Sequence, residues 1–72
     1  MPGLSKRSFT IQGHRTSVAL EPEYWAAFDM AVRAEGMTPT AWITRLDEAR
    51  DRPLASAIRV ELLKRASSRQ GN

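Results

Sequence analysis

The sequence lacks cysteine altogether and has one histidine, His14, among its 72 residues. The first absence excludes disulfides, thiolate nucleophiles and cysteine-ligated zinc or iron–sulfur sites, and a single imidazole cannot build a histidine-rich metal cage. No stretch approaches 18 consecutive apolar residues, and the first 20 residues have no apolar run of the kind that a secretory signal needs. We therefore expect a cytoplasmic protein with no membrane span and no bound metal.

The groups that catalysis requires are equally scarce. There is no glycine-rich phosphate loop, and no nucleophile stands at a recognisable spacing from a base and an orienting group. Three acids fall within residues 47–51, but arginines surround them, which predicts ion pairs rather than a carboxylate site. We expect no enzymatic activity and no cofactor.

The chain is also short of material for a core. A domain of this length buries only roughly 60% of the surface that its unfolded chain exposes, which leaves it marginally stable alone. Small domains compensate with disulfides, metals or association, and the composition excludes the first two. Self-association is therefore the expected source of further stability.

Acidic residues are missing from the first 20 positions, where Lys6, Arg7 and Arg15 stand. All eight acids fall between residues 21 and 63, against five arginines, and the end of the chain is basic again. The net charge is +3. Basic ends around an acidic middle suit a polyanion such as nucleic acid, although solvated basic tails are also common.

The N-terminal part contains the strand signals. Residues 1–8 (MPGLSKRS) have proline, glycine and two serines around one leucine, which predicts a flexible basic arm. Residues 9–11 alternate in polarity until Gln12-Gly13 interrupts them, and residues 14–20 alternate again, which predicts a half-buried strand. One face of that strand carries Thr16, Val18 and Leu20, and the other carries Arg15, Ser17 and Ala19.

Helical spacing of apolar residues predicts three helices after the strand. The first begins at Pro22, because the first turn does not need the N–H that proline lacks, and it ends before Gly36. Thr38 caps the second helix, with Pro39 at its first position, and Pro53 separates it from the third. Residues 67–72 (SSRQGN) are expected to fray, so the predicted domain spans residues 9–66.

The predicted strand needs a partner for its backbone N–H and C=O groups. Either residues 8–12 fold back on residues 14–20 as a hairpin, or the strand pairs with the same strand of a second copy about a two-fold axis. Both pairings can hold together, because a strand has two edges. In the two-fold pairing, the apolar faces of both strands would pack on a helical core of Trp25, Phe28, Trp42, Ile43 and Leu46.

Three features in this order carry a family resemblance: the strand RTSVAL (residues 15–20), the helix end Gly36-Met37, and the helix start TPTAWI (residues 38–43). Together they resemble the ribbon-helix-helix DNA-binding domains of the MetJ/Arc superfamily, over residues 14–51. The stretch KRSFTIQGHRTSV is similar to a bacterial subgroup that adds a third helix. The resemblance implies a mostly helical α+β fold in which the N-terminal strand pairs antiparallel with a partner chain, in an intertwined homodimer.

The resemblance also implies residues that read DNA, because in this family the paired strands enter the major groove of double-stranded DNA. By position these are Arg15, Ser17 and Ala19. An arginine can donate twice to guanine and a serine can donate or accept, whereas Ala19 offers only a methyl group, which departs from the polar residue usual in the family.

Phosphate contacts are implied at two further places. The family binds phosphate with the N-terminal amides of its second helix, here around Thr38 and Thr40, although Pro39 has no N–H to contribute. Lys6 and Arg7, in the predicted arm, are candidates for phosphate or minor-groove contacts.

The leading hypothesis is a homodimeric, nucleoid-associated protein that binds DNA specifically or semi-specifically and regulates transcription. The alternative is a dimeric protein-interaction module, antitoxin-like or an assembly core, with a second protein on the third helix. Val60 and Leu63 motivate the alternative, because they lie off the main apolar stripe of that helix. The six residues after Ala66 are too few for the disordered toxin-binding tail that such antitoxins usually carry.

Overall fold

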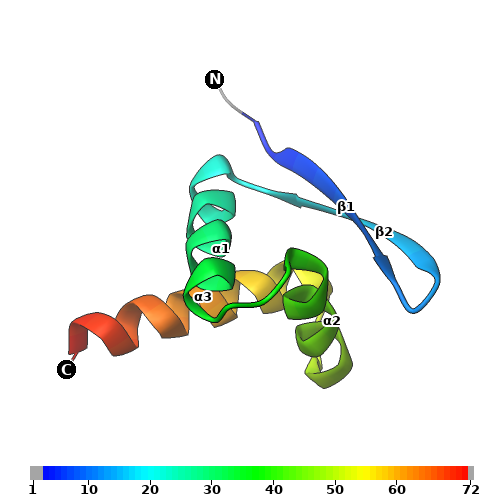
Figure 1. The fold of residues 1–72 in the computed structure, drawn as a ribbon. Coiled ribbons are helices and arrows are strands. Elements are labelled where there is room, and N and C mark those ends of the chain that lie inside the picture. Colours follow the sequence, from blue (N-terminus) through cyan, green and yellow to red (C-terminus); the bar gives the residue numbers. More distant parts are fainter. Residues whose placement is uncertain (1–2, 72) are drawn as a thin grey trace.

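The computed structural model describes residues 3–71, with side chains through Ser68, as a β-hairpin followed by three helices. The elements are β1 (Ser5–Ile11), β2 (His14–Leu20), α1 (Pro22–Ala34), α2 (Pro39–Ala49) and α3 (Leu54–Gly71). The hairpin extends to one side of the helices, and α3 crosses behind α1 and α2 (Figure 1). The expected mostly helical α+β class is confirmed.

A two-residue turn joins the strands. Gln12 and Gly13 have φ angles of 52° and 82°, so both central residues are left-handed, as in the type I′ turn whose twist suits paired strands. β1 and β2 pair antiparallel from the turn to the far end, where Ser5 stands opposite Leu20. Alternate residues of this register bury one face of the hairpin against the helices: Phe9 and Ile11 from β1, Val18 and Leu20 from β2.

Of the two pairings left open for β2, the structure contains the intrachain hairpin. The returning strand is longer than expected, because β1 begins at Ser5, inside the predicted arm of residues 1–8, whose first two residues lie outside the described part. Two side chains of α1 hold it there. The Trp25 Nε1–H donates to the Ser5 carbonyl (2.7 Å), and the Asp29 carboxylate accepts two hydrogen bonds from Arg7 (2.9 and 3.2 Å). Pairing of β2 with a partner chain stays a prediction.

The helix boundaries follow the local signals. Pro22 opens α1, and Gly36 follows its end with a φ of 65°, a left-handed conformation that glycine adopts without strain. The Thr38 hydroxyl caps α2 by accepting from the Ala41 N–H (3.0 Å). The backbone of α3 is helical to Gly71, beyond the predicted end of the domain at residue 66, because no proline or glycine interrupts it earlier. Fraying of residues 67–72 stays a prediction, and Asn72 lies outside the described residues.

Aromatic side chains form the centre of the core. Phe28 is fully buried and meets the rings of Trp25 and Trp42 edge-on, at centroid distances of 5.2 and 5.3 Å. Phe9 joins them from the hairpin, 6.1 Å from Phe28. Both tryptophans are therefore core residues, and neither offers an exposed face on which a base could stack.

Ion pairs connect the elements around this core. Arg59 of α3 donates to Glu21, which precedes α1 (3.0 Å). Glu35, at the end of α1, accepts from Arg45 of α2 (2.7 Å) and from Arg65 of α3 (2.6 Å). The predicted ion pairing around residues 47–51 is confirmed by two further contacts: Arg50 with Asp47 (2.6 Å) and Arg52 with Asp51 (3.4 Å).

Candidate nucleic-acid interface

One face of the hairpin points away from the helices. Residues that stand opposite each other in the register share a face, and the alternation that buries the apolar residues turns every second residue outward. A slip of the pairing by one residue would expose the apolar set, so the core fixes which side chains point outward. We call the outward set the outer hairpin face: Lys6 opposite Ala19, Ser8 opposite Ser17, and Thr10 opposite Arg15.

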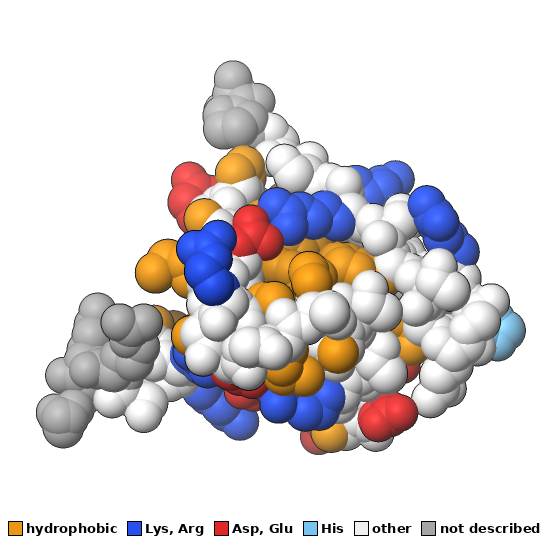
Figure 2. Space-filling view, in the orientation of Figure 1, with side chains coloured by type: hydrophobic (Ala, Val, Ile, Leu, Met, Phe, Trp, Pro, Cys, Tyr) orange, Lys and Arg blue, Asp and Glu red, His pale blue; other side chains and the backbone are white. Residues whose placement is uncertain are grey.

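The charges of the outer hairpin face are not neutralised within the chain. Lys6 and Arg15 form no ion pair with any of the described side chains, and residues 1–20 contain no acid. Figure 2 shows basic side chains along the hairpin, with an acidic side chain only at the end nearest α1. An approaching polyanion therefore meets exposed cations with no carboxylate beside them in sequence.

The middle of this face is a pair of hydroxyls. Ser8 Oγ and Ser17 Oγ lie 3.0 Å apart across the strands, at hydrogen-bond distance, and both side chains are exposed. The contact restrains the Ser17 side chain, a predicted base-reading residue. Ser17 keeps acceptor capacity, and one of the two hydroxyls keeps a free donor.

Arg7 lies on the opposite face of β1. Its guanidinium is paired with Asp29 and stands over the Trp25 ring, 4.7 Å from the ring centroid. Hydrogen bonding from Arg7 lowers the pKa of Asp29 below its ordinary value of 3.8. Of the two predicted basic contacts near the N-terminus, Lys6 thus belongs to the outer hairpin face, and the charge of Arg7 is engaged within the fold.

The N-terminus of α2, the other predicted phosphate site, has few free amides. The Ala41 N–H is already bound to the Thr38 hydroxyl (3.0 Å), the Trp42 N–H is bound to the Thr38 carbonyl (3.0 Å), and Pro39 has none. The Thr40 amide and the exposed Thr40 hydroxyl remain. A phosphate would have to displace the cap to gain the Ala41 N–H.

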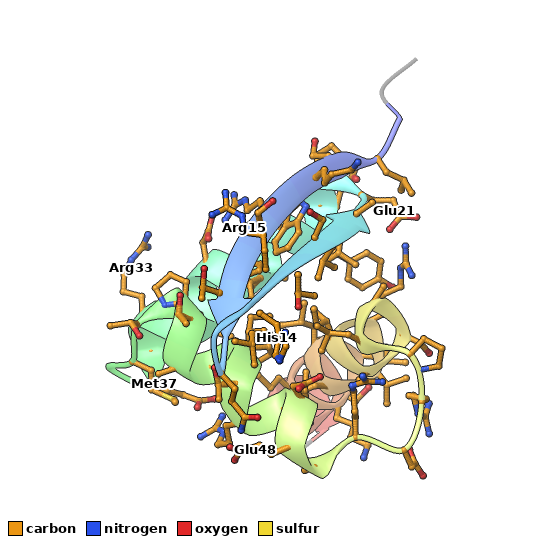
Figure 3. All side chains as sticks on the ribbon, turned by 90° about the vertical axis from the view of Figure 1, so that its right-hand side faces the viewer. His14, Arg15, Glu21, Arg33, Met37 and Glu48 are labelled. Carbon is orange, nitrogen blue, oxygen red and sulfur yellow. The ribbon has the colours of Figure 1, made fainter. Side chains whose placement is uncertain are left out.

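The tip of the hairpin contacts α2. Gln12 Nε2 donates to a Glu48 carboxylate oxygen (3.2 Å), and Figure 3 shows His14 at this end of the hairpin. In the part of the chain that the structure describes, no three His, Asp or Glu side chains gather as metal ligands. Within the same residues, no helix combines the length and apolar character of a membrane span.

Ser8 and Thr10 are outer-face residues that the sequence reading did not single out. Ser8 falls in the predicted arm, and the sequence alone leaves open the pairing of the segment that contains Thr10. The signal that finds both is Gln12-Gly13 read as a two-residue hairpin turn, since that length sets the register and hence which residues share a face with Arg15.

Comparison with known families agrees with this arrangement. The chain matches a ribbon-helix-helix domain over residues 4–66, which includes both strands, α1, α2 and most of α3. The chain therefore belongs to the ribbon-helix-helix family, whose members are typically DNA-binding regulators or antitoxins and whose fold is typically not catalytic. No curated protein and no solved structure matches it.

Proposed function

We propose that the protein is a homodimer that binds double-stranded DNA and regulates transcription, with the outer hairpin face as its DNA-contacting surface. The observation that carries the proposal is the basic, unneutralised face of a strand whose other edge is unpaired. Two copies of β2 pair across a two-fold axis and form the ribbon. Membership of the ribbon-helix-helix family supports both the dimer and the target.

The free edge of β2 suits this pairing. β2 has β1 on only one side among the described residues. In a hairpin closed by a two-residue turn, the residues beside the turn exchange two hydrogen bonds, and every second residue then directs its N–H and C=O to the other edge. On β2 that alternation assigns the free edge to Arg15, Ser17 and Ala19. An open edge is a template for a second strand, and a symmetric pair of strands gives a closed interface.

The same three residues then face the base edges. A two-stranded ribbon fits the major groove. The Arg15 guanidinium can donate to O6 and N7 of one guanine, the Ser17 hydroxyl can donate or accept, and Ala19 can contact a thymine methyl. Discrimination therefore rests mainly on Arg15, and a semi-specific protein is expected.

Phosphate contacts complete the proposed interface. Thr38 and Thr40 are exposed residues at the positive end of the α2 dipole, which favours an anion, and the Thr40 amide and the two hydroxyls are the groups there that can donate to it. Because the Ala41 N–H serves the cap, this site supplies less than a full set of helix amides. We assign it a supporting role.

The proposal is tested by selecting bound duplexes from a random pool at near-physiological salt. Enrichment of a two-fold motif supports the proposal, and the spacing of its half-sites tells whether one dimer or several bind. If the protein binds no duplex from the pool, the proposal is contradicted.

Arg15→Ala tests the residue assignment. The variant should lose about 1–3 kcal/mol of binding free energy for the enriched duplex, and much less for a scrambled one. Arg52→Ala is the matched control, because Arg52 is exposed in the connection between α2 and α3, far along the chain from the hairpin. Sedimentation should show that both variants remain dimers; equal losses in the two variants would reject the assignment.

A second candidate function is a dimeric protein-interaction module. It is supported by two exposed apolar side chains, Met30 on α1 (57%) and Leu63 on α3 (61%), which lie beside a shallow apolar groove between these helices. In that case a nuclease-treated lysate should yield one stoichiometric protein that Leu63→Glu loses and Arg15→Ala retains.

A further inference from the structure

The proposed ribbon is wider than the two strands that a major groove admits. Pairing at the β2 edges, the proposed function on which this inference rests, gives the strand order β1-β2-β2-β1. Strands lie about 4.8 Å apart, so each β1 runs about 7 Å from the two-fold axis. The groove is about 12 Å wide, so its walls stand about 6 Å from that axis. β1 therefore lies over the phosphates of the walls, and β2 lies over the base edges.

The side chains that β1 turns outward have the chemistry of phosphate ligands. They are an ammonium group and two hydroxyls, from Lys6, Ser8 and Thr10, and all three are exposed. Lysine, serine and threonine are among the residues that make most contacts to phosphate oxygens. The outer face of β1 carries no acid that would repel a phosphate.

Lys6 is the best placed of the three. It stands opposite Ala19, whose methyl group cannot compete for a phosphate, and it has no ion pair among the described side chains. The residues on both sides of it are anchored, Ser5 through the Trp25 indole and Arg7 through Asp29. Lys6 is thus presented from a fixed strand rather than from a flexible arm that reaches around the duplex.

We infer that the two strands of the hairpin contact different parts of the DNA. Lys6, Ser8 and Thr10 of β1 grip backbone phosphates on both walls of the groove, whatever the sequence, and β2 reads the bases. The Ser8 hydroxyl also restrains Ser17 across the strands, so the phosphate strand positions a base-reading side chain.

The test compares Lys6→Ala with wild type by fluorescence anisotropy, on the enriched duplex and on a scrambled duplex of equal composition, at a series of salt concentrations. Affinity should fall by the same factor for both duplexes. The slope of log affinity against log salt should drop by about 1.8 per dimer, because each lost phosphate contact removes about 0.9. Lys64→Ala is the matched control: this exposed lysine lies on α3, and its removal should leave the slope unchanged.

The outcomes separate the inference from the proposed function. If wild type binds and Lys6→Ala shows the same slope of log affinity against log salt as wild type, the proposed role of β1 is overturned and the ribbon proposal still stands. A loss confined to the enriched duplex also overturns it, since Lys6 would then read a base. Failure of wild type to bind either duplex overturns both. Unchanged far-UV circular dichroism must accompany the variant, as expected for an exposed side chain.

A second measurement locates the contact. Neutral methylphosphonates placed one at a time along the enriched duplex should weaken wild type most at the groove walls. At the one phosphate on each wall that Lys6 contacts, the replacement should have no effect on Lys6→Ala, whereas replacements at the other wall phosphates should weaken both proteins. Equal weakening of both proteins at every position would contradict the inference.

Discussion

Replacing Phe28 with leucine should lower the free energy of unfolding by about 2 kcal/mol. Phe28 is fully buried, and its ring meets Trp25 and Trp42 edge-on at 5.2 and 5.3 Å. Each such aromatic pair contributes about 0.5–1.5 kcal/mol beyond the burial of its surface. Leucine retains most of the buried apolar surface but loses these two pairs and the more distant pair with Phe9 (6.1 Å), so the expected cost is at least about 1–3 kcal/mol.

The variant should remain folded, which makes the cost measurable. A chain of 72 residues at about 0.05–0.15 kcal/mol per residue has roughly 4–11 kcal/mol of stability. With a denaturant slope of about 1 kcal/mol per molar urea, the midpoint should fall by about 2 M. Urea titration followed by far-UV circular dichroism measures this shift, at one fixed protein concentration because dimerisation makes stability concentration-dependent.

Ile43→Leu is the control for this measurement. Ile43 is also fully buried, the substitution conserves volume, and it should cost less than about 1.5 kcal/mol without removing an aromatic pair. If Phe28→Leu costs no more than this control, the aromatic geometry contributes nothing beyond buried area, and the reasoning is refuted.

Three further predictions follow from the same contacts. Hydrogen bonding from Arg45 lowers the pKa of Glu35 below its ordinary 4.5, so this carboxylate stabilises the fold above that pH and its contribution is lost as the pH falls. In Glu35→Gln, the free energy of unfolding from urea titrations should therefore fall less between about pH 5 and 3 than in wild type. An equal fall in both proteins would contradict this. Gln12→Asn removes the exposed hydrogen bond to Glu48 but should still raise stability by about 0.5 kcal/mol, because asparagine tolerates the φ of 52° better; a lower melting temperature would count against it. Val18→Asp should abolish folding, because it places a carboxylate at a site 3% exposed, and a folded variant by circular dichroism would refute the packing of β2.

Helix limits could be predicted from the sequence because their causes are local. Pro22 at a first turn, Thr38 as a cap and Gly36 in a left-handed conformation each act within one turn of the chain. The phase of residues 14–20 was equally predictable, since strand alternation assigns Val18 and Leu20 to one face whatever they pack against.

The candidate site was predictable only in part. Arg15, Ser17 and Ala19 follow from the phase of their own strand, so the sequence assigned them correctly to one face. Lys6 and Arg7 are neighbours of the same charge in the predicted arm, and only the alternation of residues 9–11, extended back through the arm, would separate them. The structure directs Lys6 outward and pairs Arg7 with Asp29.

By itself, then, the sequence determined the three helices, the apolar face of the strand and its polar face. Tertiary structure decided that residues 5–8 form a strand and that Ser8 and Thr10 share a face with Arg15. It also decided that Arg7 forms an ion pair with Asp29 of the same chain. The physical reason is range: caps and alternation act between near neighbours, whereas the contacts that hold β1 join Ser5 to Trp25 and Arg7 to Asp29, about twenty residues apart, and exist only once the hairpin lies on α1.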